Sequence, residues 1–191
     1  MQIALIRHFK TQGNIEKRYI GRTNEVLSKE GKEQINKKTY PKAEIVYSSP
    51  LYRCKETANL IYPEIKPIIC TDFIECDFGY FENKNYYELK DNSNYIKWLE
   101  SRGTLPFPNG ESTEAFKNRC CDEFDRIIRQ DNQNIAIVVH GGTIMAILDR
   151  YSNPHKDYYA WQVKNGDGYI IELDKKLWLN GERYINVIST I

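Results

Sequence analysis

Side chains capable of chemistry follow two of the apolar runs in the sequence. His8 follows Ile-Ala-Leu-Ile-Arg, and His140 follows Ile-Ala-Ile-Val-Val and precedes two glycines. If both runs are strands of one parallel sheet, both imidazoles lie beyond the carboxyl ends of the strands, where open α/β sheets bind ligands. Imidazole can act there as a nucleophile or a proton donor near neutral pH. One such histidine is as often a hydrogen-bonded core residue, but two in matching positions favour a reactive site.

Two arginines are expected beside these histidines. Arg7 directly precedes His8 and brings a permanent cation whose planar donor fork suits phosphate oxygens. Arg53 falls in the first turn of a helix that Ser49 is expected to cap, with Pro50 as its first residue. Free backbone N–H groups at such a helix start favour an anion. Either arginine alone is compatible with a surface ion pair, but two at converging element ends indicate a phosphate clamp.

The elements that position these residues follow from hydrophobic spacing. Short runs rich in β-branched residues suit strands buried on both faces of a mostly parallel sheet, and segments of helical spacing lie between them. Ser28 is expected to cap a helix that runs to about Lys38, and a long amphipathic helix begins near Ser112. Strands are expected at residues 3–6, 44–47, 68–70, 135–139, 169–173 and 183–188, and further helices at about 50–61 and from about 143.

The composition is that of one globular domain. Hydrophobic residues make up 41% and charged residues 28% of 191 residues, so we expect a single domain over 1–191 with a sizeable core. An irregular segment at about 78–110, rich in tyrosine, predicts an inserted helical lid, whose aromatic side chains serve core packing or line a substrate wall. The 27 basic and 26 acidic residues nearly cancel, which disfavours nucleic acid or an acidic membrane as partners.

Compartment and metal content are also indicated by the sequence. The first apolar run lacks a preceding basic region and a cleavage site, and no other run has membrane-spanning length, so we expect a cytoplasmic protein. The five cysteines are scattered and lack CxxC spacing, which predicts reduced core thiols and no structural metal. The third histidine, His155, follows a turn signal among polar residues and is expected in solvent.

The ordered motifs of residues 3–148 resemble those of the histidine phosphatase superfamily, also called phosphoglycerate mutase-like. Each motif alone is weak evidence for the family, but the complete set in this order is specific to it. The resemblance implies an α/β three-layer sandwich with a mostly parallel central sheet flanked by helices and a small helical lid. The matching motifs are Arg7-His8, Thr11 and Asn14, residues 47–58 (Tyr-Ser-Ser-Pro-Leu-Tyr-Arg-Cys-Lys-Glu-Thr-Ala), residues 75–79 (Glu-Cys-Asp-Phe-Gly), Gly110-Glu111-Ser112 and residues 139–142 (Val-His-Gly-Gly).

The resemblance also implies a role for each matching residue. His8 would accept the phosphoryl group, and Glu75 would protonate the leaving oxygen and then activate water. Glu75 is preferred to Asp77 and Glu82 because it aligns with the family's acid, two positions before Asp77. Thr11 and Glu111 would lie behind the reacting groups. Thr11 would help to hold the catalytic and phosphate-binding residues in place, and Glu111 would orient an arginine or a histidine. The phosphate oxygens would be bound by Arg7, Asn14, Arg53, His140 and the backbone of Gly141.

The sequence departs from the family pattern after the Arg-His pair. Phe9 and Lys10 stand where glycine and glutamate are usual, and we expect Phe9 to narrow the pocket and alter specificity. No cofactor is implied.

The predicted function is metal-independent hydrolysis of a small-molecule phosphomonoester through a phosphohistidine on His8. The chain is most similar to the branch that includes α-ribazole-phosphate phosphatase, with a small phosphorylated metabolite as partner and either a monomer or a homodimer as the assembly. The alternatives are phosphoglycerate mutase-type phosphoryl transfer and a non-catalytic module that binds phosphorylated ligands.

Overall fold

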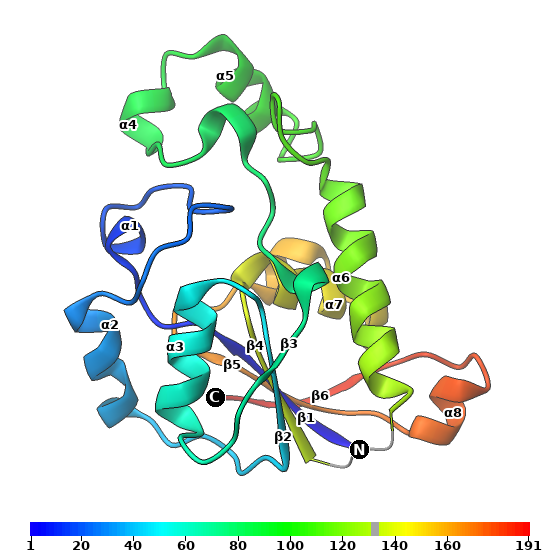
Figure 1. The fold of residues 1–191 in the computed structure, drawn as a ribbon. Coiled ribbons are helices and arrows are strands. Elements are labelled where there is room, and N and C mark those ends of the chain that lie inside the picture. Colours follow the sequence, from blue (N-terminus) through cyan, green and yellow to red (C-terminus); the bar gives the residue numbers. More distant parts are fainter. Residues whose placement is uncertain (131–133) are drawn as a thin grey trace.

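A six-stranded sheet with the order β3-β2-β4-β1-β5-β6 forms the centre of the molecule (Figure 1). The computed structural model describes residues 1–130 and 134–191. The neighbouring pairs among β3, β2, β4 and β1 are parallel, while β5 pairs antiparallel with both β1 and β6 at one edge, which confirms the mostly parallel sheet. The strands are β1 (Gln2–Arg7), β2 (Ile45–Ser48), β3 (Ile68–Ile69), β4 (Asn134–Val139), β5 (Gly168–Glu172) and β6 (Asn186–Thr190).

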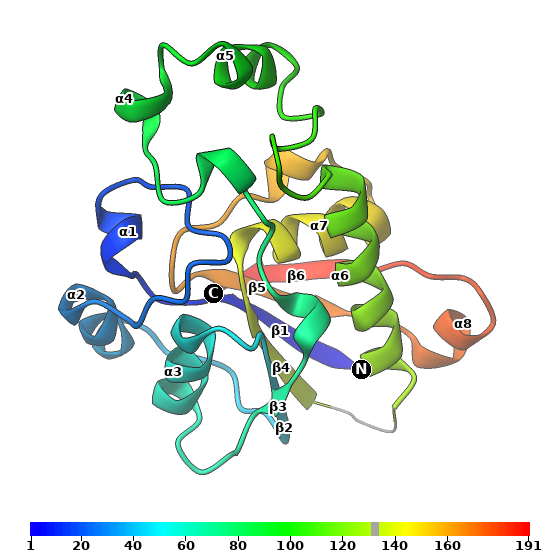
Figure 2. The ribbon, with the colours of Figure 1, turned by 45° about the horizontal axis from the view of Figure 1, so that its top comes forward.

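Helices cover both faces of this sheet, so the expected three-layer architecture is confirmed. Because strand side chains alternate between faces, Ile3 and Leu5 join one core cluster, and Ala4 and Ile6 join another. The first cluster packs under α6 and α7, and the second under α3 (Figures 1 and 2). The helices are α1 (Gln12–Ile15), α2 (Lys29–Glu33), α3 (Tyr52–Ile61), α4 (Tyr86–Leu89), α5 (Ser93–Glu100), α6 (Thr113–Ile128), α7 (Gly141–Tyr151) and α8 (Lys175–Leu179).

Two of the three expected helix caps are present. The Ser28 hydroxyl accepts a hydrogen bond from the backbone N–H of Gly31, and Ser112 does the same for Ala115. The predicted Ser49 cap is wrong, because Leu51 is the N-cap residue and α3 begins at Tyr52. The Ser49 hydroxyl instead contacts His140.

Three other boundaries differ from the sequence-based expectation. The α2 helix ends at Glu33, and a 3₁₀ helix covers the rest of the expected span. Helix α7 begins at Gly141, two residues before the expected start, because His140 itself is its N-cap. The last strand begins at Asn186, because the chain is still turning at residues 181–183.

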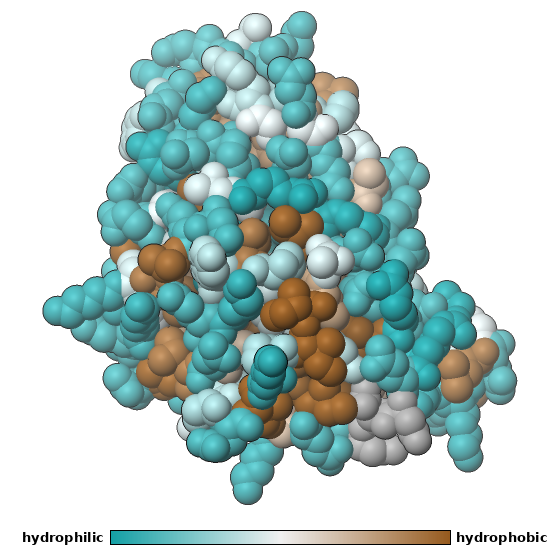
Figure 3. All heavy atoms as spheres, viewed as in Figure 1, coloured by the Kyte–Doolittle hydropathy of each residue, from teal (hydrophilic) through white to brown (hydrophobic). Residues whose placement is uncertain are grey.

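Residues 78–110 form a helical excursion beyond the carboxyl ends of the strands and carry α4 and α5 (Figures 1 and 2). The two ends of the excursion are joined by backbone hydrogen bonds, from Tyr80 to Pro108 at 2.8 Å and from Glu111 to Asp77 at 2.9 Å. Its face in Figure 3 is mainly hydrophilic, and Phe81 and Tyr95 are buried in a separate aromatic cluster.

Two further observations concern the whole chain. In the part of the chain that the structure describes, no helix combines the length and apolar character needed to cross a membrane. The five cysteines are buried and carry free thiols.

Candidate active site

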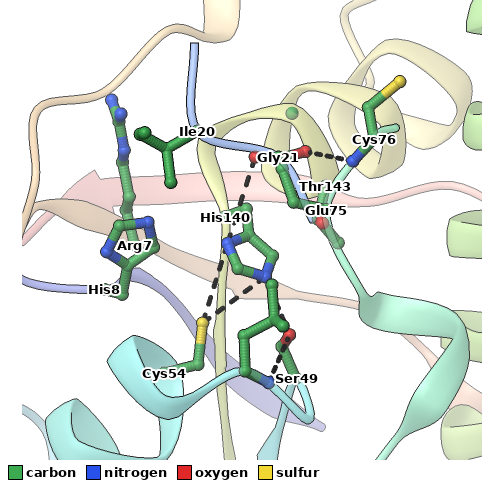
Figure 4. A network of polar contacts seen from close by, with 12 residues as sticks. Arg7, His8, Ile20, Gly21, Ser49, Cys54, Glu75, Cys76, His140 and Thr143 are labelled. Carbon is green, nitrogen blue, oxygen red and sulfur yellow. Dashed lines mark hydrogen bonds and ion pairs between the residues drawn. The ribbon is translucent and has the colours of Figure 1, made fainter. Parts of the chain in front are cut away.

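The two strand-end histidines lie side by side. In the parallel pairing of β1 and β4, Arg7 is opposite Val139, so the next residue of each strand emerges at the same edge. The rings of His8 and His140 meet edge to face with centroids 5.2 Å apart (Figure 4). The structure therefore brings together the pair that the sequence placed at strand ends.

Local hydrogen bonding fixes the tautomer of His8. Its Nδ1 lies 2.6 Å from the carbonyl oxygen of Phe9, and a carbonyl can only accept, so Nδ1 carries the proton. The Nε2 atom then keeps its lone pair. Burial, together with the nearby charges of Arg53 and Arg7, holds the pKa of His8 well below its usual 6.5. At neutral pH the ring is uncharged and nucleophilic.

His140 lies between a hydroxyl and a carboxyl group. Its Nε2 is 2.7 Å from Oγ of Ser49, and its Nδ1 is 4.0 Å from Oε2 of Glu75 (Figure 4). Burial, with Arg53 nearby, also holds the pKa of His140 well below its usual value. Burial raises the pKa of Glu75, which favours the protonated carboxyl group beside the uncharged imidazole.

Both predicted arginines reach the site, and each has an unused donor. Arg7 donates from Nη1 to the carbonyl of Val163 at 2.6 Å, while Arg53 donates to the carbonyls of Gly21 and Thr23 at 2.8 Å. The Nε–H group of each arginine is buried without a hydrogen-bond partner among the described residues. Buried unpaired donors are costly and rare, and an anion bound between the guanidinium groups would satisfy both.

Asn14 lines the site from α1, and Thr11 holds it there. The Thr11 hydroxyl accepts from the backbone N–H of Asn14, and the Asn14 side chain accepts from the backbone N–H of Thr11 in return. Asn165 donates to the same Asn14 oxygen at 3.2 Å and to the carbonyl of His8 at 3.1 Å. Asn165 thus links Asn14 to the backbone at His8.

Glu75 is the carboxyl group that faces the histidines, as the resemblance implied. Its Oε1 accepts from the backbone N–H of Cys76 at 2.9 Å, and a Cβ at Gly142 would lie 2.8 Å from that oxygen. Only glycine leaves this room at the start of α7. Of the two rival carboxylates, Asp77 caps the backbone of Gly79 and Glu82 binds another loop.

Arg119, which the sequence did not single out, supports the backbone at Glu75. Its guanidinium donates to the carbonyls of Ile74 and Glu75 at 2.6 and 3.2 Å, and to that of Asp72 at 2.6 Å. Glu111 accepts from Nε and Nη2 of Arg119 at 2.7 and 2.8 Å. Glu111 therefore orients an arginine, as the resemblance implied, and that arginine acts on the chain that carries Glu75.

Glu82 supports Arg53 in a comparable way. Its Oε1 accepts from the backbone N–H groups of Gly21 and Thr23 at 2.9 Å and from the Thr23 hydroxyl at 2.7 Å. The carbonyls of the same loop accept from Arg53. No sequence spacing indicated this link, because the three segments are distant in the chain.

A cavity of about 390 Å³ opens above these residues. Arg7, His8, Asn14, Glu75 and Gly141 line its base, while Arg53 and His140 are fully buried and do not line it. We call Arg7, His8, Arg53, Glu75 and His140 the phosphate floor. Apart from His8, seven aromatic residues line the cavity and are here called the aromatic wall: Tyr19, Phe78, Trp98, Phe107, Phe116, Tyr158 and Tyr159. Phe116 and Tyr158 lie beside Gly142, next to the phosphate floor.

Gly141 adds a helix start to the phosphate floor. It is the first residue of the 11-residue helix α7, and a Cβ there would lie 3.4 Å from Cζ of Arg7. The absence of a side chain leaves the approach to the first backbone N–H groups of the helix open. These groups and the Arg7 guanidinium favour an anion at the same place.

The expected effect of Phe9 on the pocket is wrong. Phe9 is completely buried, does not line the cavity, and packs edge to face on Tyr40 at 6.1 Å. Its backbone N–H donates to the Thr57 hydroxyl. The ring thus fills the protein behind the site, and Lys10 pairs with Glu30 away from the cavity at 2.6 Å.

Comparison with known proteins identifies the family. The family model described as histidine phosphatase superfamily, branch 1, matches residues 3–182. The chain belongs to the histidine phosphatase superfamily. This histidine phosphatase is 30% identical over 186 residues to the adenosylcobalamin/α-ribazole phosphatase of Escherichia coli K12, covering 92% of each chain.

Solved structures agree with the family assignment. A putative α-ribazole-5′-P phosphatase from Escherichia coli superposes with a TM-score of 0.84 at 26% identity, covering 98% of this chain and 94% of that one. A phosphoglycerate mutase from Thermus thermophilus superposes with a TM-score of 0.74 at 25% identity, covering 100% and 98%. The phosphoglycerate mutase-like fold is confirmed, and the chain is an enzyme that hydrolyses phosphate esters.

Proposed function

We propose that this histidine phosphatase hydrolyses a small phosphorylated metabolite, a phosphomonoester, through a phosphohistidine on His8 and without a metal ion. The observation that carries the proposal is the hydrogen bond from Nδ1 of His8 to the Phe9 carbonyl, which leaves the Nε2 lone pair free. Burial keeps the ring uncharged, so the nucleophile is ready at neutral pH. The same hydrogen bond supports the positive charge that the ring gains when Nε2 bonds to phosphorus.

The two steps use His8 and Glu75. First, Nε2 bonds to phosphorus while the ester P–O bond breaks, and the leaving oxygen takes the proton of Glu75. Second, the Glu75 carboxylate removes a proton from water, whose oxygen bonds to phosphorus while the N–P bond breaks. The sum converts ester and water into alcohol and inorganic phosphate and restores both side chains. The raised pKa of Glu75 suits the first step, because that step needs the protonated acid.

Positive charge from the protein stabilises the transferring group in this proposal. Arg7 offers its Nε–H group at the cavity, Arg53 adds its positive charge from behind the cavity lining, and the first turn of α7 offers backbone N–H groups near Gly141. Fixed donors of this kind need no reorganisation when charge develops on the phosphoryl oxygens. The bound dianion would in turn favour protonated His140, which then becomes a further donor.

Hydrolysis is favoured over the mutase alternative by the charges that line the cavity. A mutase of the phosphoglycerate type must hold a second acidic group on its substrate. Beyond the phosphate floor the lining cations are Lys17 and Arg18, and Arg18 is already paired with Glu16 at 2.7 Å and Glu88 at 2.8 Å. A non-catalytic binding module would not need the nucleophile tautomer of His8 or the raised pKa of Glu75.

The test compares the wild type with His8→Ala on p-nitrophenyl phosphate and a panel of phosphorylated metabolites in the presence of a chelator. We expect turnover by the wild type, a loss on the order of 10⁴-fold or more in the variant, and acid-labile phosphorylation of the wild type after a rapid quench. Turnover that survives His8→Ala would overturn the mechanism. Absence of turnover across the panel would support the binding module, and exchange between 2- and 3-phosphoglycerate faster than hydrolysis would support the mutase.

A further inference from the structure

Three side-chain amides from segments far apart in the sequence are linked behind His8. Asn14 belongs to α1, Gln34 opens the 3₁₀ helix that follows α2, and Asn165 lies in the loop before β5. A side-chain amide has a donor end and an acceptor end, and only its partners decide which end faces the cavity. The hydrogen bonds of these residues determine the orientation of each amide.

The orientation of Asn165 follows from the backbone of His8. One end of the Asn165 amide lies 3.1 Å from the His8 carbonyl oxygen, and a carbonyl can only accept, so this end is the NH₂ group. The same nitrogen has a second proton and lies 3.2 Å from the side chain of Asn14. The Asn14 atom that meets this donor must therefore be the amide oxygen, Oδ1.

A second hydrogen bond gives Asn14 the same orientation independently. The backbone N–H of Thr11 donates to Asn14 Oδ1 at 3.1 Å, and a backbone N–H can only donate. Because the oxygen is held by two donors, the NH₂ group of Asn14 is directed away from them. Asn14 lines the base of the cavity beside His8, and its Nδ2 makes no hydrogen bond with a described residue. That NH₂ group is free to donate to a ligand.

The loop that carries Asn165 is held from its other side. Gln34 donates from Nε2 to the Asn165 carbonyl at 2.8 Å and accepts at Oε1 from the backbone N–H of Lys10 at 2.9 Å. The backbone N–H of Gly166 donates to the His8 carbonyl at 3.2 Å. The Asn165 amide is therefore in place before any ligand binds, and the His8 carbonyl has a donor besides Asn165.

We propose that Asn165 is a positioning residue that orients the Asn14 amide so that its NH₂ group donates to the phosphoryl group at His8. The same Asn165 nitrogen then holds both the backbone of the nucleophile and the donor that meets the transferred group. A donor fixed in this way needs no reorganisation when charge develops on the phosphoryl oxygens. This inference rests on the proposed function, because it takes the phosphoryl group to bind at His8.

A double-mutant cycle tests whether Asn165 acts through Asn14. Asn14→Ala should lower kcat/KM for p-nitrophenyl phosphate by about 10- to 100-fold, the range for a hydrogen bond to a charged group. Asn165→Leu should lower it by about three- to tenfold, the worth of a neutral hydrogen bond. In the Asn14→Ala background, Asn165→Leu should have no measurable effect, because the residue through which it acts is gone. Equal losses in both backgrounds would overturn the proposal.

Gln34→Leu is the matched control. It removes two hydrogen bonds from the same network, as Asn165→Leu does, but keeps the Asn165 side chain. We expect both variants to lower the unfolding temperature to a similar extent, while Gln34→Leu changes kcat/KM by less than about twofold, since its partners are neutral backbone groups. A loss of activity as large as that of Asn165→Leu would show that the loop acts only as structural support and would overturn the proposal.

Binding of inorganic phosphate reports on the Asn14 amide without turnover. In ¹H–¹⁵N spectra of the wild type, the side-chain NH₂ signal that is absent from Asn14→Ala should move when phosphate is added. The shift should be much smaller in Asn165→Leu. An Asn14 signal that saturating phosphate leaves unchanged in the wild type would overturn the inference, even if no variant folds.

These measurements separate the inference from the proposed function. If the Asn14 signal responds to phosphate and the response depends on Asn165, but no ester is hydrolysed, the inference stands and the proposed function fails. If esters are hydrolysed through a phosphohistidine and the Asn14 signal does not respond, the inference fails and the proposed function stands.

Discussion

The phosphate floor and the aromatic wall face the same cavity but are built in different ways. Arg7, His8 and His140 end or follow strands, Arg53 lies at a helix start, and Glu75 lies on a loop that Arg119 supports. Backbone register and hydrogen bonds to carbonyl groups fix these residues. Among the wall residues, Tyr19, Phe78, Trp98 and Phe107 hold one another by ring contacts. We therefore expect the reaction to depend on the floor residues and the choice of ligand to depend on the wall residues. Floor variants should lower kcat for every substrate, and wall variants should change the ranking of substrates.

Among the variants that test this comparison, Glu75→Gln at the floor is expected to change kcat the most. Loss of the general acid should lower kcat for alkyl phosphates by about 10²- to 10⁴-fold. The loss should be smaller for p-nitrophenyl phosphate, whose leaving group needs no proton, so that only activation of water in the second step is impaired. In the wild type, the rate on alkyl phosphates should fall as pH rises through the raised pKa of Glu75, because the carboxylate cannot donate. Steady-state pH profiles check both points.

The control for Glu75→Gln is thermal unfolding as a function of pH. A folded-state pKa above the unfolded value means that stability is lost as pH rises through the folded pKa. Glutamine does not ionise, so above that pH the variant should be at least as stable as the wild type. An unchanged alkaline limb in the variant would assign that limb to another group.

A smaller effect is expected for Arg119→Gln, which leaves every cavity-lining side chain in place. The carbonyls of Ile74 and Glu75 lose their donor, so the Glu75 carboxyl group is less well positioned. We expect kcat for alkyl phosphates to fall roughly 10- to 100-fold, the cost of misplacing a reacting group by about 1 Å, with little change in KM. Arg126→Gln, an exposed arginine on the same helix, is the matched control.

The Arg119 prediction separates positioning from general loss of structure. If Arg119 acts through Glu75, p-nitrophenyl phosphate should lose less activity than alkyl phosphates, because only its second step needs Glu75, and the alkaline limb of the alkyl phosphate profile should shift. An equal loss on both substrates, with a lower unfolding temperature, would instead show a purely structural role for the Glu111 and Arg119 pair.

The smallest effect on activity is expected for Phe9→Leu. Because the Phe9 ring lies behind the floor, KM should change less than about twofold for every substrate, while the free energy of unfolding should fall by about 1–3 kcal/mol through imperfect repacking. Substrate panels and denaturant unfolding measure the two quantities. A change in substrate ranking would place Phe9 among the residues that select the ligand.

The sequence predicted the features that depend on local structure and missed those that depend on contacts between distant segments. His8 and His140 were placed correctly because strand direction alone brings the ends of β1 and β4 together. The Ser49 cap was wrong because a contact with His140, 91 positions away in the chain, competes with the local one. Helix-capping propensity considers only the neighbouring residues, so it predicts Ser49 as an N-cap and takes no account of a partner so distant in the sequence.

Thr11 and Glu111 were predicted to support the site, but Arg119 escaped prediction for the same reason. Arg119 is one of many charged positions on an amphipathic helix, and only the fold brings the carbonyls of residues 72–75 to it. The sequence showed that the excursion is rich in aromatic residues but did not show which of them are core, surface or cavity-lining residues. In the structure, Phe81 is buried, Tyr87 is exposed and Trp98 lines the cavity. Phe9 was misjudged because adjacency to His8 in the chain does not mean adjacency in the pocket.

The hydrogen bonds between Asp77 and Glu111 and between Tyr80 and Pro108 close the base of the excursion at residues 78–110. The chain enters and leaves at one place, and beyond this junction Glu88 and Tyr95 also contact Arg18 and Tyr19. Replacing residues 86–104 would alter the Trp98 side of the wall while Glu82 and Glu111 stay in place. A scaffold joined in this way lets natural variation, or a protein engineer, change the substrate without rebuilding the reaction.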